Sequence, residues 1–171
     1  MTQTLGPYIT NEQTATFAVN NAGLVNAKPV LVTMGTIEAP VTAADDTIIL
    51  CALPTDSKLI EVSLAFDDLE AQEVAPDSTM HLGLFRQSAP GVFTVVDADI
   101  LAASIDVFTA AVALTNYRFS AQNINTAQMP TWDLALSARP AYNQMYLGLT
   151  TAVSTLGTDI GTISFRVLYT L

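Results

Sequence analysis

Apolar residues recur at every second position near the C-terminus. One face of the final run carries Ile163, Phe165, Val167 and Tyr169, and polar residues stand between them as far as Arg166. This alternation is the pattern of a half-buried strand. Residues 145–153 alternate in the same way, and the Gly/Ser/Thr/Asp-rich stretch 154–161 separates the two runs. We therefore predict a terminal β-hairpin, and its apolar faces require a second sheet to cover them.

Several earlier segments show the same period of two. They are residues 30–37, 47–53, 59–66 and 80–85, with a shorter run at 93–96. Pro54, Asp56 and Ser57 stand between the second and third of these, and proline and aspartate favour turn geometry. The stretch LCALPTDSKLIEVSLAF (50–66) therefore predicts another hairpin.

Two segments have helical spacing instead. In 97–107, Ile100, Ala103 and Val107 would share one helical face. Asp97 or Asp99 would then cap the N-terminus of that helix. Pro130 suits the first turn of a short helix over 131–136. The body is therefore predicted to be an all-β antiparallel sandwich with one or two short helices.

Residues 1–27 precede this body and are polar and nearly uncharged, with a short alternating patch at 14–19. One interpretation is a loosely draped leader. The other is an extended arm that lies on a neighbouring subunit or a host surface and offers its backbone as an added strand. The candidate anchors of such an arm are Leu5, Tyr8, Ile9, Phe17 and Val19. So many apolar residues would be unusual in a free tail, so we favour an arm (1–27) followed by one domain (28–171).

Composition narrows the range of partners. The chain has 171 residues, which is about one domain, and half of them are hydrophobic while only 13% are charged. Its surface must therefore consist largely of uncharged polar residues, which is more typical of an assembly subunit than of a freely diffusing enzyme. The net charge is −10, with only six scattered lysines and arginines. Direct nucleic-acid binding is not expected, because it requires clustered basic residues.

A single cysteine, Cys51, excludes an intrachain disulfide and a cysteine-rich zinc site. The N-terminal residues lack the basic flank and apolar core of a signal peptide. No apolar run reaches the roughly 18 residues of a membrane helix. We expect a soluble protein that is made in the cytoplasm and is not bound to a membrane.

Catalytic candidates are few. A nucleophile needs a base within hydrogen-bond reach, and the chain offers one histidine, His81, and one thiol, Cys51. Both fall in the middle of predicted strands, with no nucleophile elbow and no glycine-rich phosphate loop. Asp97 and Asp99 would also fit a pair of catalytic carboxylates, but the helix cap is the simpler interpretation. We predict that the chain is not an enzyme.

The sequence also offers two candidate binding sites. Trp132 and Tyr142 would fit a sugar platform, although Trp132 lies beside Leu134 and Leu136 and is better explained as a core residue. The acidic stretch 67–77 could bind Ca²⁺. It matches no EF-hand spacing and lacks the turn glycine, so a solvated loop is favoured. Its carboxylates are Asp67, Asp68, Glu70, Glu73 and Asp77. No cofactor is predicted.

Residues 28–171 resemble the head decoration, or cement, proteins of tailed bacteriophages. The resemblance rests on the order of elements: a polar leader, a strand ending in Leu53-Pro54, the strand Leu82-Gly83-Leu84, a short helix with Trp132, and Gly161-Thr162 at the start of the last strand. It implies a β-sandwich of jelly-roll type that binds the outer surface of the capsid and stabilises the head.

The same resemblance implies the major capsid protein as the partner and the exterior of the virion as the location. It also implies a homo-oligomer, with a trimer expected first and a dimer second, because such proteins gather at symmetry axes. The alternative is a carbohydrate- or receptor-binding β-sandwich of a phage tail or fibre. That alternative predicts an exposed cluster of aromatic side chains.

Overall fold

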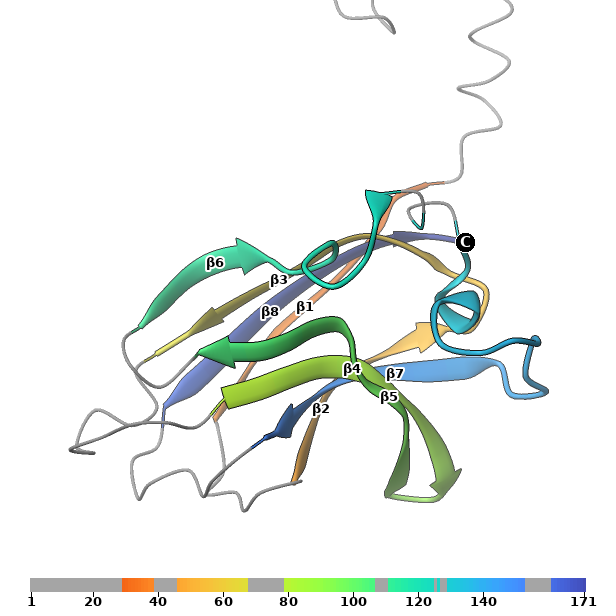
Figure 1. Cartoon of the computed structure of the whole chain (residues 1–171), viewed down its shortest axis with the longest axis horizontal. Coiled ribbons are helices and arrows are strands. Elements are labelled where there is room, and N and C mark those ends of the chain that lie inside the picture. The colour runs from red at the N-terminus through yellow and green to blue at the C-terminus, as the bar shows by residue number, and fades with distance from the viewer. Residues whose placement is uncertain are drawn as a thin grey trace, which may run out of the picture.

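The computed structural model describes residues 29–38, 46–67, 79–106, 111–124, 126, 129–152 and 161–171, which form two antiparallel four-stranded sheets packed face to face (Figure 1). Sheet A contains, in spatial order, β1 (Leu31–Glu38), β8 (Thr162–Thr170), β3 (Lys58–Phe66) and β6 (Val112–Asn116). Sheet B contains β2 (Thr47–Pro54), β7 (Gln144–Thr151), β4 (Thr79–Ala89) and β5 (Val92–Asp106).

The strand order identifies the sandwich as a jelly roll. The orders β1-β8-β3-β6 and β2-β7-β4-β5 place the first and last strands side by side in one sheet and the second and seventh side by side in the other. This nested pairing of eight strands is the jelly-roll arrangement. The predicted all-β antiparallel sandwich of jelly-roll type is confirmed.

The core lies between the sheets and takes side chains from both. Val62 and Val167 point into it from sheet A, and Leu82 and Leu147 from sheet B, and all four are fully buried. Burial of each such side chain stabilises the fold by about 1.5–3 kcal/mol. The alternation that predicted the strands thus reflects one face in the core and one face outside it.

Two glycines stand opposite each other on the outer face of sheet B. Gly83 of β4 pairs with Gly148 of β7, between paired leucines that point into the core. A Cβ atom on Gly83 would come well under 3.0 Å from the carbonyl oxygens of Asp97 and Ala98. The backbone of β5 therefore lies directly against the outer side of Gly83, which only a residue without a side chain permits.

Both predicted hairpins are wrong, although their strands are right. β2 and β3 are consecutive and joined by a tight turn, yet β2 pairs with β7 while β3 pairs with β8 and β6. Likewise β7 belongs to sheet B and β8 to sheet A. In this jelly roll the chain crosses from one sheet to the other at these turns. The alternation within a strand carries no information about which sheet the strand joins.

The predicted helix over 97–107 is also wrong, because the described part of this segment belongs to the long strand β5. The pairing of β4 with β5 shifts register between Leu82 and Leu84, whose partners are Ala102 and Asp97. A step of two residues along β4 therefore corresponds to a step of five residues along β5. This bulge interrupts the period of two, so that Leu101, Ala102 and Ile105 are the buried residues. They are not the residues of the predicted helical face, of which Ala103 is exposed.

The short helix after Pro130 is present as the 3₁₀ helix η2 (Thr131–Leu134), which is two residues shorter than predicted. Buried Thr131 anchors it, because its backbone N–H and its hydroxyl both donate to the carbonyl of Ser57, each at 2.7 Å. The helix therefore closes one end of the sandwich over the turn between β2 and β3.

Several predictions fall outside the described residues. The arm at 1–27, with its candidate anchors Leu5, Tyr8, Ile9, Phe17 and Val19, lies there, as do most of the acidic stretch and residues 154–160. Asp67 is the one described member of the acidic stretch. Its carboxylate accepts hydrogen bonds from the backbone N–H and the hydroxyl of Thr162, where β8 begins.

Candidate assembly surface

β1 is an edge strand of sheet A and pairs with β8 on one side (Figure 1). Its eight residues pair without any register shift, from Leu31 opposite Tyr169 to Glu38 opposite Thr162. Among the described residues, no strand pairs with its other side. A regular edge of this kind presents backbone N–H and C=O groups to which a strand of another chain can be added.

β1 carries apolar side chains on both of its faces. Val32 and Met34 point away from the core and are 49% and 68% exposed, and Val30 just before the strand is 54% exposed. Leu31 and Ile37 point the other way and are half-buried at the margin of the core. We call residues 30–38 the β1 edge. It exposes apolar surface and an open row of backbone groups together.

The other three edge strands of the two sheets are less regular. β6 has only five residues, and its pairing with β3 shifts register. β5 shifts register against β4 at four places, and β2 shifts against β7 between Ile49 and Cys51. Natural edge strands are usually protected by bulges, charges or short length. The β1 edge has no bulge, lysine or proline in its strand, and its one charge is at Glu38.

A shallow groove of about 360 Å³ continues from the β1 edge across the outer face of sheet A. Its walls include Met34 and Thr36 of β1, Ser164 and Arg166 of β8, and Leu114 of β6. Leu114 is 49% exposed, so that apolar surface lies on both sides of the polar residues of β8. The outer face of sheet A is thus suited to contact with another protein surface more than to holding a small molecule.

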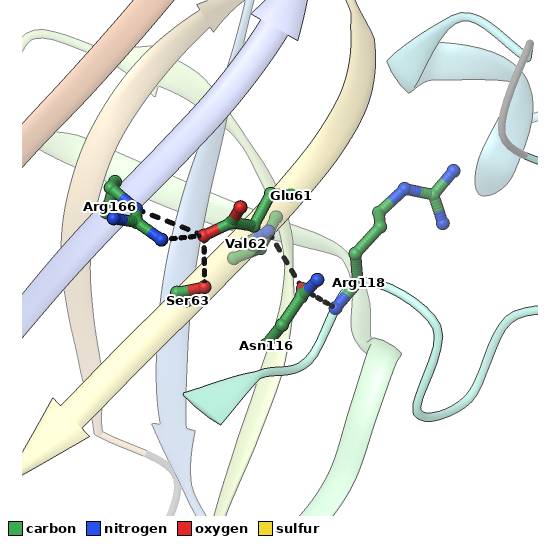
Figure 2. Close-up of polar contacts among 6 residues, drawn as sticks. All are labelled: Glu61, Val62, Ser63, Asn116, Arg118 and Arg166. Atoms are coloured by element: carbon green, nitrogen blue, oxygen red, sulfur yellow. Dashed lines mark hydrogen bonds and ion pairs between the residues drawn. The ribbon is translucent and has the colours of Figure 1, made fainter. Parts of the chain in front are cut away.

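An ion pair lies on this face between neighbouring strands. Figure 2 shows Arg166 of β8 and Ser63 of β3 converging on one carboxylate oxygen of Glu61. The distances to Glu61 Oε1 are 3.0 Å from Arg166 Nε, 2.5 Å from Arg166 Nη2 and 2.6 Å from Ser63 Oγ. The hydrogen bonds from Ser63 and Arg166 lower the pKa of Glu61. They hold an acid in its charged form beside the groove.

Replacing Glu61 with glutamine is expected to lower the free energy of unfolding at pH 7 by about 0.5 kcal/mol, which is the usual range for a partly exposed pair. A lowered pKa means that the charged form contributes stability above the ordinary glutamate pKa, and that this contribution is lost as the pH falls through the lowered value. Urea unfolding at pH 7 and pH 3 tests this. Glu38→Gln on the neighbouring edge strand is the control, and an equal loss at both pH values would contradict the role of the charge.

A second concave site lies on the outer face of sheet B. It has a volume of about 300 Å³ and is lined by Gln87, Tyr142, Asn143, Gln144 and Tyr146. The hydroxyl of Tyr146 donates to Gln87 Oε1 at 3.1 Å and lies 3.3 Å from Gln144 Oε1. The ring of Phe93 meets that of Tyr146 edge-on, with centroids 4.9 Å apart. We call this the tyrosine pocket. Its lining of rings and amides, without charge, suits a neutral polar ligand.

His81 and Cys51, the two candidate catalytic residues, do not form a catalytic pair. Cys51 is part of the core, and burial raises the pKa of its thiol to about 12. Met80 and Leu82 point into the core, so His81 between them faces outward on the other side of the sheet. Its Nδ1 accepts a hydrogen bond from the backbone N–H of Ser104 at 3.0 Å. A cysteine nucleophile acts as a thiolate near a base, and Cys51 satisfies neither condition.

Asp97 and Asp99 lie within the bulged part of β5, so neither caps a helix. Asp97 Oδ1 accepts a hydrogen bond from the backbone N–H of Asp99 at 3.3 Å, which is an Asx-type turn. Burial, with the nearby charge of Asp99 adding to it, raises the pKa of Asp97. The pair is explained by the local path of β5 over Gly83.

Trp132 and Tyr142 do not form a sugar platform together. Trp132 is partly buried against the core, as the core interpretation predicted, and its backbone N–H donates to Thr55. Tyr142 instead lines the tyrosine pocket with Tyr146. Tyr146 was not predicted as a site residue from the sequence. Its outward position in the alternating strand β7 was the one available signal.

Within the described ranges, no group of three or more His, Cys, Asp or Glu side chains is placed to hold a metal ion. No helix in that part of the chain is long and apolar enough to cross a membrane. The candidate anchors of the arm lie outside this part, so the structure does not bring them to any surface described here.

No protein-family model matches the sequence, and no curated protein sequence does. Among solved structures, a chain in the capsid of Ralstonia phage GP4 aligns with 85% of this chain and 86% of its own length, at 21% identity and a TM-score of 0.58. A chain in the capsid asymmetric unit of cyanophage Pam1 aligns with 85% of this chain and 87% of its own length, at 16% identity and a TM-score of 0.52. The likeness is one of fold, over chains similar in length to this one.

Proposed function

We propose that this chain is a structural protein of a bacteriophage virion that binds the outer surface of the head and stabilises it, as decoration or cement proteins do. The observation that carries the proposal is the jelly roll, which is shared over most of their length with chains of two phage capsids. The long uncovered β1 edge supports a role in assembly. The proposal assigns the chain no catalytic activity.

The charge of the chain supports a position outside the shell. A net charge of −10 with six basic residues gives little attraction to packaged nucleic acid. A protein that binds only the assembled shell stabilises it by mass action, because its binding sites exist only on the intact shell. Repetition of the contact by capsid symmetry increases the total effect.

The partners in this proposal are the major capsid protein and other copies of the chain. We propose that the arm at 1–27, through Leu5, Tyr8, Ile9, Phe17 and Val19, is the element that faces the capsid or links subunits. A trimer is the expected oligomer, with a dimer second, because closed symmetric oligomers suit the axes of a symmetric shell.

Deleting residues 1–27 is expected to abolish binding to heads while the β-sandwich remains folded. Among the described residues, every buried core residue lies at or beyond Ile48, and all eight strands lie between Leu31 and Thr170, so we expect the sandwich to fold without the arm. The measurement is co-sedimentation with heads of the parent phage that lack this protein, with circular dichroism to verify folding. The full chain and Val92→Lys, a change at the exposed first residue of β5, are the controls. Unchanged binding would remove the arm from the account, and no binding by the full chain would remove the function.

The tyrosine pocket favours a second candidate function, which is binding of carbohydrate or a receptor by a phage tail or fibre. Aromatic faces pack against the C–H faces of sugars, and amides such as Gln87 and Asn143 pair with hydroxyl groups. Tyr146→Ala should then weaken binding to a glycan array by about tenfold or more, since a ring and a hydroxyl are lost together. Tyr169→Ala, a tyrosine of sheet A that does not line the pocket, is the control. No binding by the wild-type chain would exclude this candidate.

A further inference from the structure

The β1 edge is incomplete in two respects. Its backbone groups have no partner strand on one side among the described residues, and Val32 and Met34 leave apolar surface exposed beside them. Ile37 packs against the core but is only half-buried, so the margin of the core is also partly open here. An added strand would form hydrogen bonds with these backbone groups and would cover the exposed apolar side chains. Such a strand must carry little charge, because the edge itself is uncharged except at Glu38.

One segment of the chain has these properties. Residues 14–19 read TATFAV, with no charge and with Ala15, Phe17 and Val19 alternating with small residues. The segment belongs to the 28 residues that precede Pro29 and lie outside the described structure. We propose that the β1 edge of one copy binds residues 14–19 of a second copy as an added strand of sheet A. This inference rests on the proposed function, since it names the subunit contact of the decoration protein.

Two features favour a second copy over the same chain. Pro29 stands directly before the edge, and the residue before a proline is biased toward an extended backbone, so we expect the chain to enter β1 without a tight turn. Eleven residues, 20–30, separate the segment from β1, which is much longer than the two to five residues of an ordinary hairpin loop. Fully extended, they span up to about 36 Å. That length exceeds the roughly 26 Å of an eight-residue strand, so it is sufficient for the segment to extend past β1 to a second copy.

A mixing experiment with full-length variants tests the proposal. The edge variant carries Val32→Lys and Met34→Lys, both at exposed outward positions that leave the core intact. The arm variant carries Phe17→Lys and Val19→Lys. Each variant alone is expected to self-associate about 100-fold more weakly than the wild type, because two apolar contacts are lost. Mixed together, they should form a one-to-one complex, since the intact arm of one fits the intact edge of the other.

Size-exclusion chromatography with light scattering reads the result, and Val92→Lys is the matched control that should associate as the wild type does. A wild-type monomer, an arm variant that still associates, or a mixture that stays monomeric would each overturn the proposal. An arm variant that still associates would indicate that two β1 edges pair with each other or that another face makes the contact. A monomeric mixture would indicate that the arm pairs with the edge of its own chain. Binding to phage heads is measured separately. If the variants mix as expected but the wild type does not bind heads, only the proposed function is refuted. If the wild type binds heads but the variants do not form a mixed complex, only this inference is refuted.

Discussion

Replacing Gly83 with alanine is expected to lower the free energy of unfolding by about 3 kcal/mol or more, a large effect for one methyl group. The added Cβ would fall well under 3.0 Å from the carbonyl oxygens of Asp97 and Ala98. Both are backbone atoms, so no side-chain rotation relieves the contact. β5 would have to move away from β4, which would disturb the buried residues Leu101 and Ala102.

The control for this prediction is Gly91→Ala in the turn between β4 and β5. A Cβ on Gly91 would meet nothing within 4 Å, but its φ of +75° is unfavourable for a side chain. Gly91→Ala should therefore lower the free energy of unfolding by only about 1 kcal/mol, because only the backbone conformation is unfavourable. Urea unfolding of both variants measures the difference. If Gly83→Ala were no less stable than Gly91→Ala, the close approach of β5 to Gly83 would be refuted.

The strands of this fold could be predicted from the sequence, but not their assembly into sheets. Alternation depends on one strand having one buried face, which is a local property. Which strand lies beside which depends on contacts between residues far apart, such as Leu31 with Tyr169. Short turns such as 55–57 suggested hairpins because consecutive strands usually pair. In the jelly roll these turns instead connect the two sheets.

The helix predicted at 97–107 failed for a different physical reason. A bulge inserts extra residues on one strand, so the buried positions of β5 no longer follow a period of two. The apparent helical face of Ile100, Ala103 and Val107 is not the buried face, because Ala103 is exposed. The glycine that accommodates the bulge, Gly83, was visible in the sequence only as part of a Leu-Gly-Leu strand. Its role follows from where β5 lies in three dimensions.

The candidate surfaces were predictable only in part. The apolar character of residues 30–37 was evident, but whether a strand lies at an edge or in the middle of a sheet depends on the topology. The tyrosine pocket joins Gln87 of β4 to residues more than fifty positions later. Buried Arg118 was missed because an isolated arginine in a polar stretch normally lies on the surface.

Replacing this arginine with methionine is expected to lower the free energy of unfolding by about 3 kcal/mol. The side chain of Arg118 is fully buried, and burial lowers its pKa. Its Nε donates to the carbonyl of Leu59 in β3 at 3.1 Å, and its Nη2 donates to the carbonyl of Thr126 at 2.9 Å. Figure 2 shows where this residue leaves the end of β6, beside the Asn116 side chain, whose Oδ1 accepts from the backbone N–H groups of Arg118 and Val62.

A buried charged residue can often be replaced by an apolar residue of similar volume at little cost in stability. The size of the effect therefore depends on which hydrogen-bond acceptors lose their donor when the arginine is removed. Here methionine fills the space but removes the side-chain donor to the Leu59 carbonyl, and a buried carbonyl without a donor costs about 1–3 kcal/mol. The Thr126 carbonyl also loses the arginine but keeps the backbone N–H of Met129, at 3.0 Å. Arg118→Lys should fall between methionine and the wild type, because one ammonium group cannot reproduce the arginine fork. Arg86→Met, at an exposed arginine of β4, should change stability by less than about 0.5 kcal/mol. If Arg118→Met unfolded at the same urea concentration as Arg86→Met, the link from β3 to the segment after β6 would contribute nothing to stability.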